Sequence, residues 1–396
     1  MQSMAASSKK IVVGIDIGSL MTRVIVAEES PKLGVAPKII GIGYAETHGL
    51  RHGYVTSARE ASESVNEAVR MAEKNTGIEI KRAYVAIGGI SLSSEIGSGA
   101  VSVQRPDGEI ADEDLQNVMQ IAREAFGAHK KNRRVLHAIP LKYRLDGAEV
   151  LGNPVGMRGS RLEARVVFVT IQEHHFNDLV TAVTDAGVDI IDVVAAPIAE
   201  SLATLTKKQK MVGCGLLNIG SETVSLAVFD NDVPVSVAVF TIGSSDITND
   251  IALGLRITLD EAERVKTGRY EERSYAKKKI EEIVGARLGD IFEIVQQHLK
   301  LIKRDGLLPA GVVITGGGGL LDSIDEASRD SLKLPTSVAQ VSQIMNTRKD
   351  LDPSWLVAYG LCFLEDDEQV YGSKIFKQMF KESKKGIMKI LKEFLP

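Results

Sequence analysis

The pattern of apolar and polar positions repeats itself along this 396-residue chain. Residues 11–29 read as an apolar strand, a polar-Ile-Gly-Ser turn and a second apolar strand, and residues 213–231 read the same way. Each half later has a strand that ends in glycines, at 83–89 and at 311–319. Because a duplicated unit of strands and helices folds into two similar layered lobes, the pattern predicts two α/β lobes with a cleft between them.

Helical periodicity fills the segments between these strands. A third strand follows each strand pair, at 39–46 and 234–243. Residues 57–75 have a Ser N-cap and an apolar face of period 3.6, which predicts a helix. Residues 258–266 begin with a capping box. Residues 277–304 predict one long helix or two short ones.

A block at about 91–170 has no counterpart in the second half of the chain. It contains a strand, an acid-capped helix at 111–126 and further strands. We therefore expect an inserted subdomain between the two repeated units.

Composition and charge narrow the class of protein. Apolar residues make up 44% and charged residues 25% of the chain, an ordinary globular balance. The net charge of −4 argues against a nucleic-acid binder.

Cys214 and Cys362 lie far apart without CxxC spacing, which indicates buried reduced thiols in a reducing compartment. The N-terminus lacks the apolar core of a signal peptide, and no apolar run reaches the roughly 18 residues of a membrane span. His137, His174 and His175 have no other metal ligands at useful spacing, so we expect structural or surface histidines.

The two Gly-Ser turns are candidates for phosphate loops. In the first, from Asp16 to Thr22, Gly18 lets the backbone turn tightly, so that successive N–H groups can face an anion. Asp16 could hold a water of a bound Mg²⁺ ion, which keeps most of its waters. A plain hairpin turn is the alternative for one such loop. Two turns at equivalent places, together with a glycine run, favour nucleotide binding.

The glycine run Thr315–Gly319 follows an apolar strand and would let backbone approach a ligand closely. Glu263 and Lys266 share one face of helix 258–266 and could contact ribose hydroxyls and the adenine edge; a solvated ion pair is the alternative. The predicted nucleotide-binding residues are Asp16, Gly18, Ser19, Leu20, Met21, Gly220, Ser221, Glu222, Thr223, Glu263, Lys266, Gly316, Gly317 and Gly318.

These elements resemble the nucleotide signature of the actin, heat-shock chaperone and sugar-kinase superfamily. DIGSLMT resembles its first phosphate loop, NIGSETVS its second and TGGGG its adenosine motif. Residues 192–205 and 355–363 resemble its two connecting helices. The insert adds VLHAIPLKYRLDG at 135–147 and NPVGMRGSRLEARVVFVT at 153–170, which, with residues 242–268, are similar to the FtsA family. The resemblance covers roughly residues 10–365.

The resemblance implies an α/β, actin-like fold, with two duplicated ribonuclease-H-like lobes around a nucleotide cleft and an FtsA-type inserted subdomain 1C. The implied divisions are a disordered N-terminus at 1–10, subdomain 1A at 11–90 and 171–206, subdomain 1C at 91–170, subdomain 2A at 207–243 and 306–364, subdomain 2B at 244–305, a linker at 365–373, and an amphipathic membrane-targeting helix at 374–396.

The same resemblance implies ATP and Mg²⁺ as cofactors. It implies head-to-tail self-association through 1C into a filament, binding of the FtsZ C-terminal peptide in 2B, and later division proteins as further partners. The implied location is the cytoplasmic face of the cell membrane at the division site. Arg287 matches the arginine that FtsA proteins use towards the acidic peptide. By its position alone, Arg287 is one surface arginine on an amphipathic helix.

Three residues depart from the superfamily pattern. Asn218 stands where the second loop usually begins with Asp, so we expect Asp16 and Asn218 to hold Mg²⁺ only through water. Glu222 would repel a γ-phosphate unless it turns outward. Ala196 precedes Pro197 where active hydrolases offer Glu or Gln, and Glu200 lies one turn further on. We therefore predict ATP binding with negligible hydrolysis, and turnover above about 1 s⁻¹, within the range of ordinary enzymes, would contradict it.

The last segment, 374–395, has the pattern of a helix in an anionic membrane interface. It holds seven lysines and two glutamates, a net +5, so the rest of the chain carries −9. A helix docked on its own protein is the alternative. The predicted lipid-facing stripe is Phe376, Met379, Phe380, Ile387, Ile390, Leu391 and Phe394, and the lysine face includes Lys381, Lys385 and Lys389.

Two other function classes stay open at this point. A small-molecule kinase or phosphatase of the same superfamily is disfavoured by Ala196 and by the membrane tail. A PilM-like adaptor of pilus assembly shares a similar insert, but the NPVGMRG run and the terminal helix favour FtsA.

Overall fold

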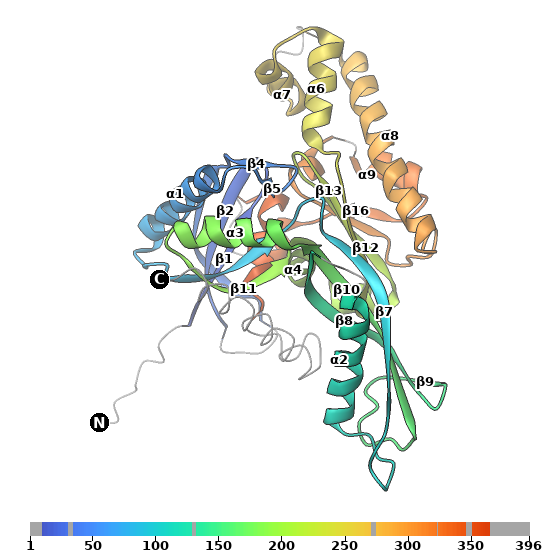
Figure 1. Cartoon of the computed structure of the whole chain (residues 1–396). Helices are drawn as coiled ribbons and strands as arrows, with labels where there is room; N and C mark the ends of the chain where they lie inside the picture. Colours follow the sequence, from blue (N-terminus) through green and yellow to red (C-terminus); the bar gives the residue numbers. More distant parts are fainter. Residues whose placement is uncertain are drawn as a thin grey trace, which may run out of the picture.

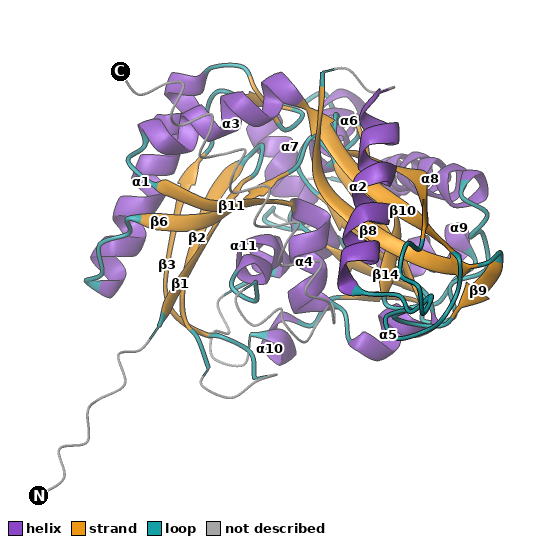
Figure 2. Cartoon of the chain, turned by 60° about the horizontal axis from the view of Figure 1, so that its bottom comes forward, coloured by secondary structure: helices purple, strands orange, loops and turns teal. Residues whose placement is uncertain are grey.

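The first lobe is a five-stranded sheet with helices on both faces. The computed structural model describes residues 10–30, 35–128, 132–270, 275–322, 324–345 and 351–364. The sheet order is β11-β6-β1-β2-β3, antiparallel across β1, β2 and β3 and parallel across β1, β6 and β11. Helices α1 and α3 cover one face, and α4 and α11 pack on the other (Figure 2). The elements are β1 (Ile11–Ile17), β2 (Met21–Glu28), β3 (Lys38–Glu46), α1 (Ala58–Thr76), β6 (Arg82–Ile87), α3 (Glu173–Asp185), β11 (Asp189–Ala195), α4 (Ala196–Thr204) and α11 (Leu356–Leu361), with the short hairpin β4 (Leu50–Arg51) and β5 (Tyr54–Val55).

The second lobe repeats this topology. Its strand order β16-β15-β12-β13-β14 matches that of the first sheet, strand for strand, as the internal repeat predicted. Helices α6, α7 and α8 stand together at one end of the molecule, at the top of Figure 1. The elements are α5 (Lys207–Val212), β12 (Cys214–Ile219), β13 (Val224–Asp230), β14 (Val233–Phe240), α6 (Ser244–Leu255), α7 (Leu259–Lys266), α8 (Lys277–Leu301), β15 (Val312–Thr315), η1 (Gly317–Leu320), α9 (Ile324–Leu332), β16 (Thr336–Val338), α10 (Val341–Ile344) and η2 (Pro353–Trp355).

The insert forms a third unit with its own apolar core. Its strands run in the order β7-β10-β8-β9, and α2 packs on one face of them, at the lower right of Figure 1. A single residue pair, Ala238 with Ser93, joins β14 to β7 and makes one nine-stranded sheet of the insert and the second lobe. The elements are β7 (Ser93–Ser102), α2 (Asp112–Ala128), β8 (Arg133–Leu145), β9 (Ala148–Val150) and β10 (Arg161–Gln172).

Local sequence signals explain the boundaries of α1 and the start of α7. Ser57 caps α1 by accepting from the Glu60 backbone N–H, and the left-handed Gly77 ends the helix. Thr258 caps α7 through the Glu261 N–H. The segment predicted as one or two helices at 277–304 is the single helix α8.

The prediction for residues 192–205 was wrong at its start. We expected a connecting helix throughout, but residues 192–195 complete strand β11, and the helix begins at Ala196 with Pro197 in its first turn. The preceding run of Ile and Val favours a strand, and proline is tolerated in the first turn of a helix, where its missing N–H has no partner to lose.

Glycine contacts fix α4 and α11 against the first sheet. A Cβ atom on Gly14 of β1 would lie 2.3 Å from the Ala358 carbonyl oxygen of α11, and one on Gly360 of α11 would lie 1.9 Å from the Ala199 carbonyl oxygen of α4. Backbone therefore packs on backbone across these elements, which sets the depth at which α4 lies in the molecule.

The thiol and membrane-span predictions can be checked within the described ranges. Both cysteines are buried and unpaired, as predicted. None of the helices in these ranges has the length and apolarity needed to cross a membrane. The predicted linker and amphipathic helix, residues 365–396, lie outside the described residues.

Candidate functional site

A cleft lies where corresponding strands of the two lobes end. The cleft takes its walls from the turns after β1 and β12, the first turns of α4, and the glycines after β6 and β15. Its cavity volume is about 160 Å³, below the roughly 300–1,000 Å³ of a typical ligand pocket. Of the predicted residues, those that line it are Asp16, Gly18, Ser19, Leu20, Met21, Asn218, Gly220, Ser221, Thr223, Gly316 and Gly317.

The two turns have the same internal geometry. The Gly18 N–H donates to the Met21 carbonyl at 3.2 Å, and the Gly220 N–H donates to the Thr223 carbonyl at 2.9 Å. Each turn closes a β-hairpin, and both turns border the same cleft. Two tight turns with glycine at their first position thus lie against one space, the arrangement expected of paired anion-binding loops.

The glycine run packs tightly against the end of β12. Gly316 has φ +76°, and a Cβ atom there would lie 2.5 Å from the Ile219 carbonyl oxygen, so the position requires glycine. Gly317 borders the cleft with open space around its Cα. Gly318 is buried, and its Cα packs against the Ile219 side chain rather than facing the cleft.

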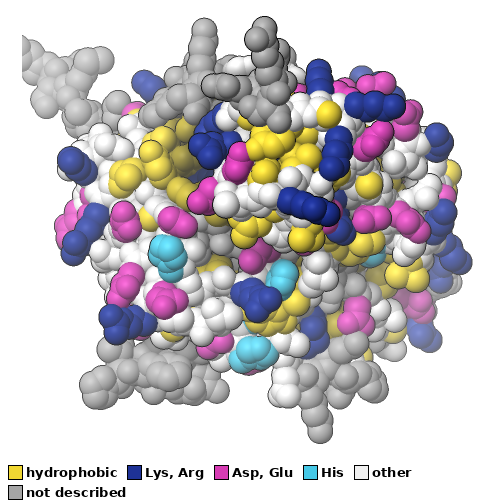
Figure 3. Space-filling model, turned by 90° about the horizontal axis from the view of Figure 1, so that it is seen from above, with side chains coloured by type: hydrophobic (Ala, Val, Ile, Leu, Met, Phe, Trp, Pro, Cys, Tyr) yellow, Lys and Arg dark blue, Asp and Glu magenta, His cyan; other side chains and the backbone are white. Residues whose placement is uncertain are grey.

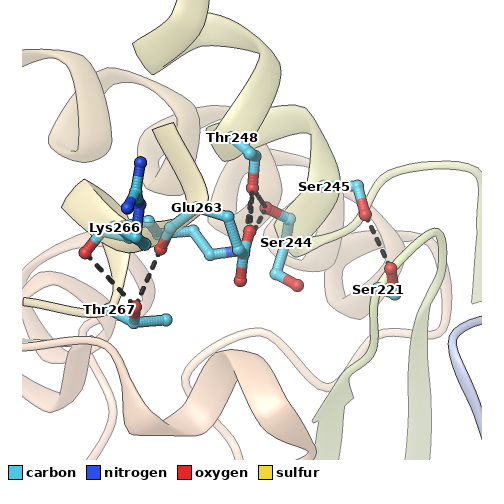
Figure 4. A network of polar contacts seen from close by, with 8 residues as sticks. Ser221, Ser244, Ser245, Thr248, Glu263, Lys266 and Thr267 are labelled. Carbon is cyan, nitrogen blue, oxygen red and sulfur yellow. Dashed lines mark hydrogen bonds and ion pairs between the residues drawn. The ribbon is translucent and has the colours of Figure 1, made fainter. Parts of the chain in front are cut away.

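Lys266 and Glu263 belong to a polar network at the cleft edge (Figure 4). The Lys266 ammonium donates to the Thr248 hydroxyl at 2.8 Å and to the Ser244 carbonyl at 3.2 Å, and lies 2.7 Å from the Glu263 carboxylate. The Lys266 side chain is only 8% exposed, unlike that of a solvated ion pair. Because Ser244 also lines the cleft, the network joins α7 to the cleft wall.

Glu222 turns away from the cleft and contacts the opposite lobe. Its Oε2 accepts from the His52 backbone N–H at 2.5 Å, and its carbonyl oxygen lies 3.3 Å from His52 Nδ1. His52 belongs to the turn between β4 and β5 in the first lobe. The contact therefore spans the two lobes beside the cleft mouth, and it removes the expected repulsion of a γ-phosphate.

Two carboxyl groups lie at the base of the cleft, that of Glu200 fully buried and that of Asp16 half-buried. Burial raises the pKa of Asp16 to about 6, and the nearby Arg23 guanidinium offsets part of this rise. Burial raises the pKa of Glu200 further, to about 8, although the hydrogen bond from Asn218 and the nearby Thr315 hydroxyl act in the other direction. Both groups thus lie in an environment that disfavours negative charge.

Several cleft residues escaped the sequence prediction. Arg23, Glu200 and Ser244 line the cleft, as do Gly88 and Gly89. The glycine pair follows β6, which is the counterpart of β15, so the repeat carried a signal for it. Glu200 was noted in the sequence only as an acid one turn beyond Ala196, because its place in the cleft depends on how α4 packs against β12.

The histidines have structural contacts. His137 Nε2 accepts from the Ala195 N–H at 3.0 Å, and burial lowers the pKa of this imidazole to about 4. His175 stacks on Tyr54 with ring centroids 4.5 Å apart, and its Nδ1 lies 3.0 Å from the Ser91 hydroxyl. In the described ranges, no group of His, Cys, Asp and Glu side chains could hold a metal ion by itself.

Arg287 lies on α8, away from the cleft. Its guanidinium binds Asp250 of α6 through two hydrogen bonds of 2.7 and 3.1 Å, and it lies 3.2 Å from Asp290. The side chain is 29% exposed. The arginine is thus held by acids of its own chain at the surface of the helical end.

The family models and sequence relatives agree with each other. Residues 89–170 match the model described as the SHS2 domain inserted in FTSA, and residues 215–360 match the model of cell division protein FtsA. Cell division protein FtsA of Bacillus subtilis (strain 168) is 29% identical over 95% of this chain and 88% of its own length. Its counterpart in Escherichia coli (strain K12) is 27% identical over 81% of each chain.

Solved structures show the same fold at lower identity. The PilM-PilN type IV pilus biogenesis complex superposes with a TM-score of 0.67 at 18% identity, covering 90% of this chain and 99% of that one. Ethanolamine utilization protein EutJ from Carboxydothermus hydrogenoformans gives a TM-score of 0.53 at 17% identity over 89% of each chain. The predicted fold class, two duplicated actin-like lobes with an inserted SHS2 unit, is confirmed.

Proposed function

This chain belongs to the FtsA family of cell-division proteins, and on that premise we propose that it binds ATP in the cleft, self-assembles on the cytoplasmic face of the cell membrane and tethers FtsZ filaments there. The observation that carries the ATP proposal is the pair of equivalent turns on one cleft, with the Lys266 network at its edge. The turns would bind the phosphates through backbone N–H groups. The network and the Gly316–Gly317 backbone would bind the adenosine.

The base of the cleft fits the Mg²⁺ ion that accompanies ATP. Its two carboxyls, Asp16 and Glu200, have raised pKa values, and Arg23 is the only basic side chain among the described residues that line the cleft. Mg²⁺ would supply that positive charge and screen the carboxyls from the phosphates. Asp16 and the Asn218 amide would hold its waters.

Hydrolysis is expected to be slow. Ala196 lines the cleft with a methyl group beside Pro197, so this position offers nothing to orient a water. Bound ATP would then act by holding the lobes closed. Phosphate release below about 1 s⁻¹, at the low end of ordinary turnover, is the expected result.

Self-association is supported by apolar side chains at opposite ends of the molecule. At the end of the insert, Leu151 is 96% and Met157 44% exposed. At the α6–α8 end, Leu253 is 78% and Leu259 57% exposed. Figure 3 views the molecule from that end, where apolar side chains lie among basic and acidic ones. Contacts between unlike ends generate rings when the rotation between subunits closes and open filaments when it does not, and never a two-fold dimer.

Arg287 can bind an acidic peptide only if a peptide carboxylate replaces Asp250 as its partner. A carboxylate of the FtsZ C-terminal peptide would take over the bidentate contact that Asp250 now makes at 2.7 and 3.1 Å. Replacing Asp250 with Asn should therefore strengthen peptide binding, whereas replacing Arg287 with Ala should weaken it.

Flotation with anionic liposomes tests the tether. We expect full-length protein to float, and a chain that ends at Glu368 to stay at the bottom. A full-length variant with Phe380 and Leu391 replaced by Asp controls for length and should also fail to float. Co-flotation of FtsZ with the full-length protein alone would support the tether. Flotation of the truncated chain would overturn the membrane assignment.

A further inference from the structure

Glu200 lies at the base of the cleft with an unsatisfied carboxylate oxygen. The side chain is fully buried on α4, yet it borders the cleft. Its Oε1 accepts from Asn218 Nδ2 at 2.9 Å. Its Oε2 is buried without a hydrogen bond of normal geometry from any described residue. A buried polar atom left in this state costs free energy, so its presence calls for a ligand or a function.

Rigid elements hold this carboxyl in place. Helix α4 packs backbone to backbone on α11 where Gly360 meets Ala199, the residue before Glu200. Asn218 is at the end of β12, where it pairs with Thr315 of β15 in the parallel ladder. The Asn218 side chain is directed by two neighbours, since its amide nitrogen donates to Glu200 and its oxygen lies beside Gly316. The Glu200 carboxyl group is thus held in a fixed position before any ligand binds.

The charges around Glu200 favour a cation. Asp16 and Glu200 line the same cleft. Of the described residues that line it, Arg23 is the only basic one. Two carboxylates in one poorly solvated site, with a single basic side chain beside them, are stabilised by an added positive charge. Carboxylate oxygens in a phosphate-binding cleft are ligands that suit a hard divalent ion.

We propose that Glu200 is the second carboxylate of the Mg²⁺–ATP site, acting with Asp16 at the base of the cleft, and that Asn218 serves to orient Glu200 rather than to replace a charge. The inference rests on the proposed ATP site and goes beyond it by assigning the acidic partner of the ion to α4. Mg²⁺ in proteins is commonly held by one or two carboxylates together with waters and substrate phosphates.

The test compares ATP binding with and without Mg²⁺ in full-length protein. Isothermal titration with ATP is done for the wild type and for Glu200→Gln, once in excess Mg²⁺ and once in EDTA. We expect Glu200→Gln to weaken Mg²⁺-dependent ATP binding by about 10- to 100-fold, the usual effect of losing a metal-site partner. In EDTA the same variant should bind ATP as tightly as the wild type or more tightly, because it lacks a charge that repels the phosphates.

Two further variants make the result specific. Glu67→Gln changes an exposed carboxylate of α1 and should leave both titrations unchanged. Asn218→Asp combined with Glu200→Gln moves the carboxylate across the 2.9 Å hydrogen bond and should restore most of the Mg²⁺ dependence. Unchanged ATP binding of Glu200→Gln in EDTA shows that the single variant is folded.

The outcomes distinguish a failure of the Glu200 assignment from a failure of the ATP-binding proposal. If the wild type fails to bind ATP with or without Mg²⁺, the ATP site itself is wrong, and this inference with it. If the wild type binds Mg²⁺–ATP and Glu200→Gln keeps the full Mg²⁺ dependence, only the role of Glu200 is wrong. Equal weakening in Mg²⁺ and in EDTA would also overturn it, since that result marks Glu200 as a packing residue.

Discussion

Replacing Gly360 with Ala should separate α11 from α4 and disturb the cleft at a distance. The added Cβ atom would lie 1.9 Å from the Ala199 carbonyl oxygen, 2.5 Å from its carbon and 3.0 Å from the Glu200 nitrogen. All three are backbone atoms, so no side chain can rotate away. Ordinary contact begins at 3.4 Å, and relieving the overlap therefore requires the helices to move apart by about 1.5 Å (3.4 − 1.9), a shift that dense packing opposes.

The cost follows from the density of the surrounding core. Overpacking a core typically costs about 1–3 kcal/mol, and a backbone-to-backbone clash belongs at the upper end of that range. Each kcal/mol lowers the melting temperature of a domain of 150–250 residues by about 2–4 °C, so we expect a fall of roughly 6–12 °C. Because α4 carries Pro197 and Glu200 into the cleft, ATP affinity should fall as well.

A matched control is available on α8. A Cβ atom on Gly285 would meet nothing within 4 Å. Gly285→Ala should therefore raise stability by about 0.5–1 kcal/mol, the general gain of Ala over Gly inside a helix. Thermal unfolding followed by circular dichroism, with ATP titration of each folded variant, makes the comparison. A Gly360→Ala protein as stable as Gly285→Ala would refute the argument from close packing.

Three other changes test the cleft. Glu200 binds a proton in the folded state up to about pH 8 but only up to about pH 4.5 when unfolded. Without ATP, the unfolding free energy should therefore fall as pH rises between these values. Urea melts at pH 5 and pH 8 measure this fall, and Glu200→Gln should remove it. Glu222→Ala breaks the contact with the His52 N–H across the lobes. In stopped-flow measurements, this variant should release a fluorescent ATP analogue about tenfold faster than the wild type. An unchanged release rate would mean that the contact does not hold the lobes together. Lys266→Ala should weaken ATP and adenosine about equally, by roughly tenfold, while sparing pyrophosphate in competition assays; selective loss of pyrophosphate would move the adenosine site elsewhere.

Features fixed by local spacing could be predicted from the sequence. The two Gly-Ser turns, their flanking strands and the insert between the repeats follow from short-range patterns, because a tight turn needs glycine at a defined place and a buried strand needs an apolar run. The repeat also predicted that the two lobes share one topology, and the second sheet does have the strand order of the first.

Features that depend on distant packing could not be predicted. Glu200 reads as one polar residue in an apolar helix until α4 is placed against β12, 18 residues further along the chain. The same holds for Glu222, which seemed to face a phosphate but binds a backbone N–H 170 positions away in sequence. The start of α4 was misjudged because a short apolar run is ambiguous by periodicity alone, and the β-branched residues before Pro197, which favour a strand, were read as part of the helix.

The inner end of the insert is held by both lobes. Ala238 of β14 pairs with Ser93 of β7, and the Ser94 hydroxyl hydrogen-bonds the Val237 backbone N–H and carbonyl. On the other side, His137 of β8 accepts from the Ala195 N–H of the first lobe. From there the strands run outward, and the 13 residues of β8 at about 3.3 Å each span roughly 43 Å. A rotation of about 5° at the inner end would carry the far end by nearly 4 Å over that length, enough to make or break a packed contact. A small change in the angle between the lobes would thus reach the outer end of the insert as a larger displacement, where a neighbouring subunit could detect it.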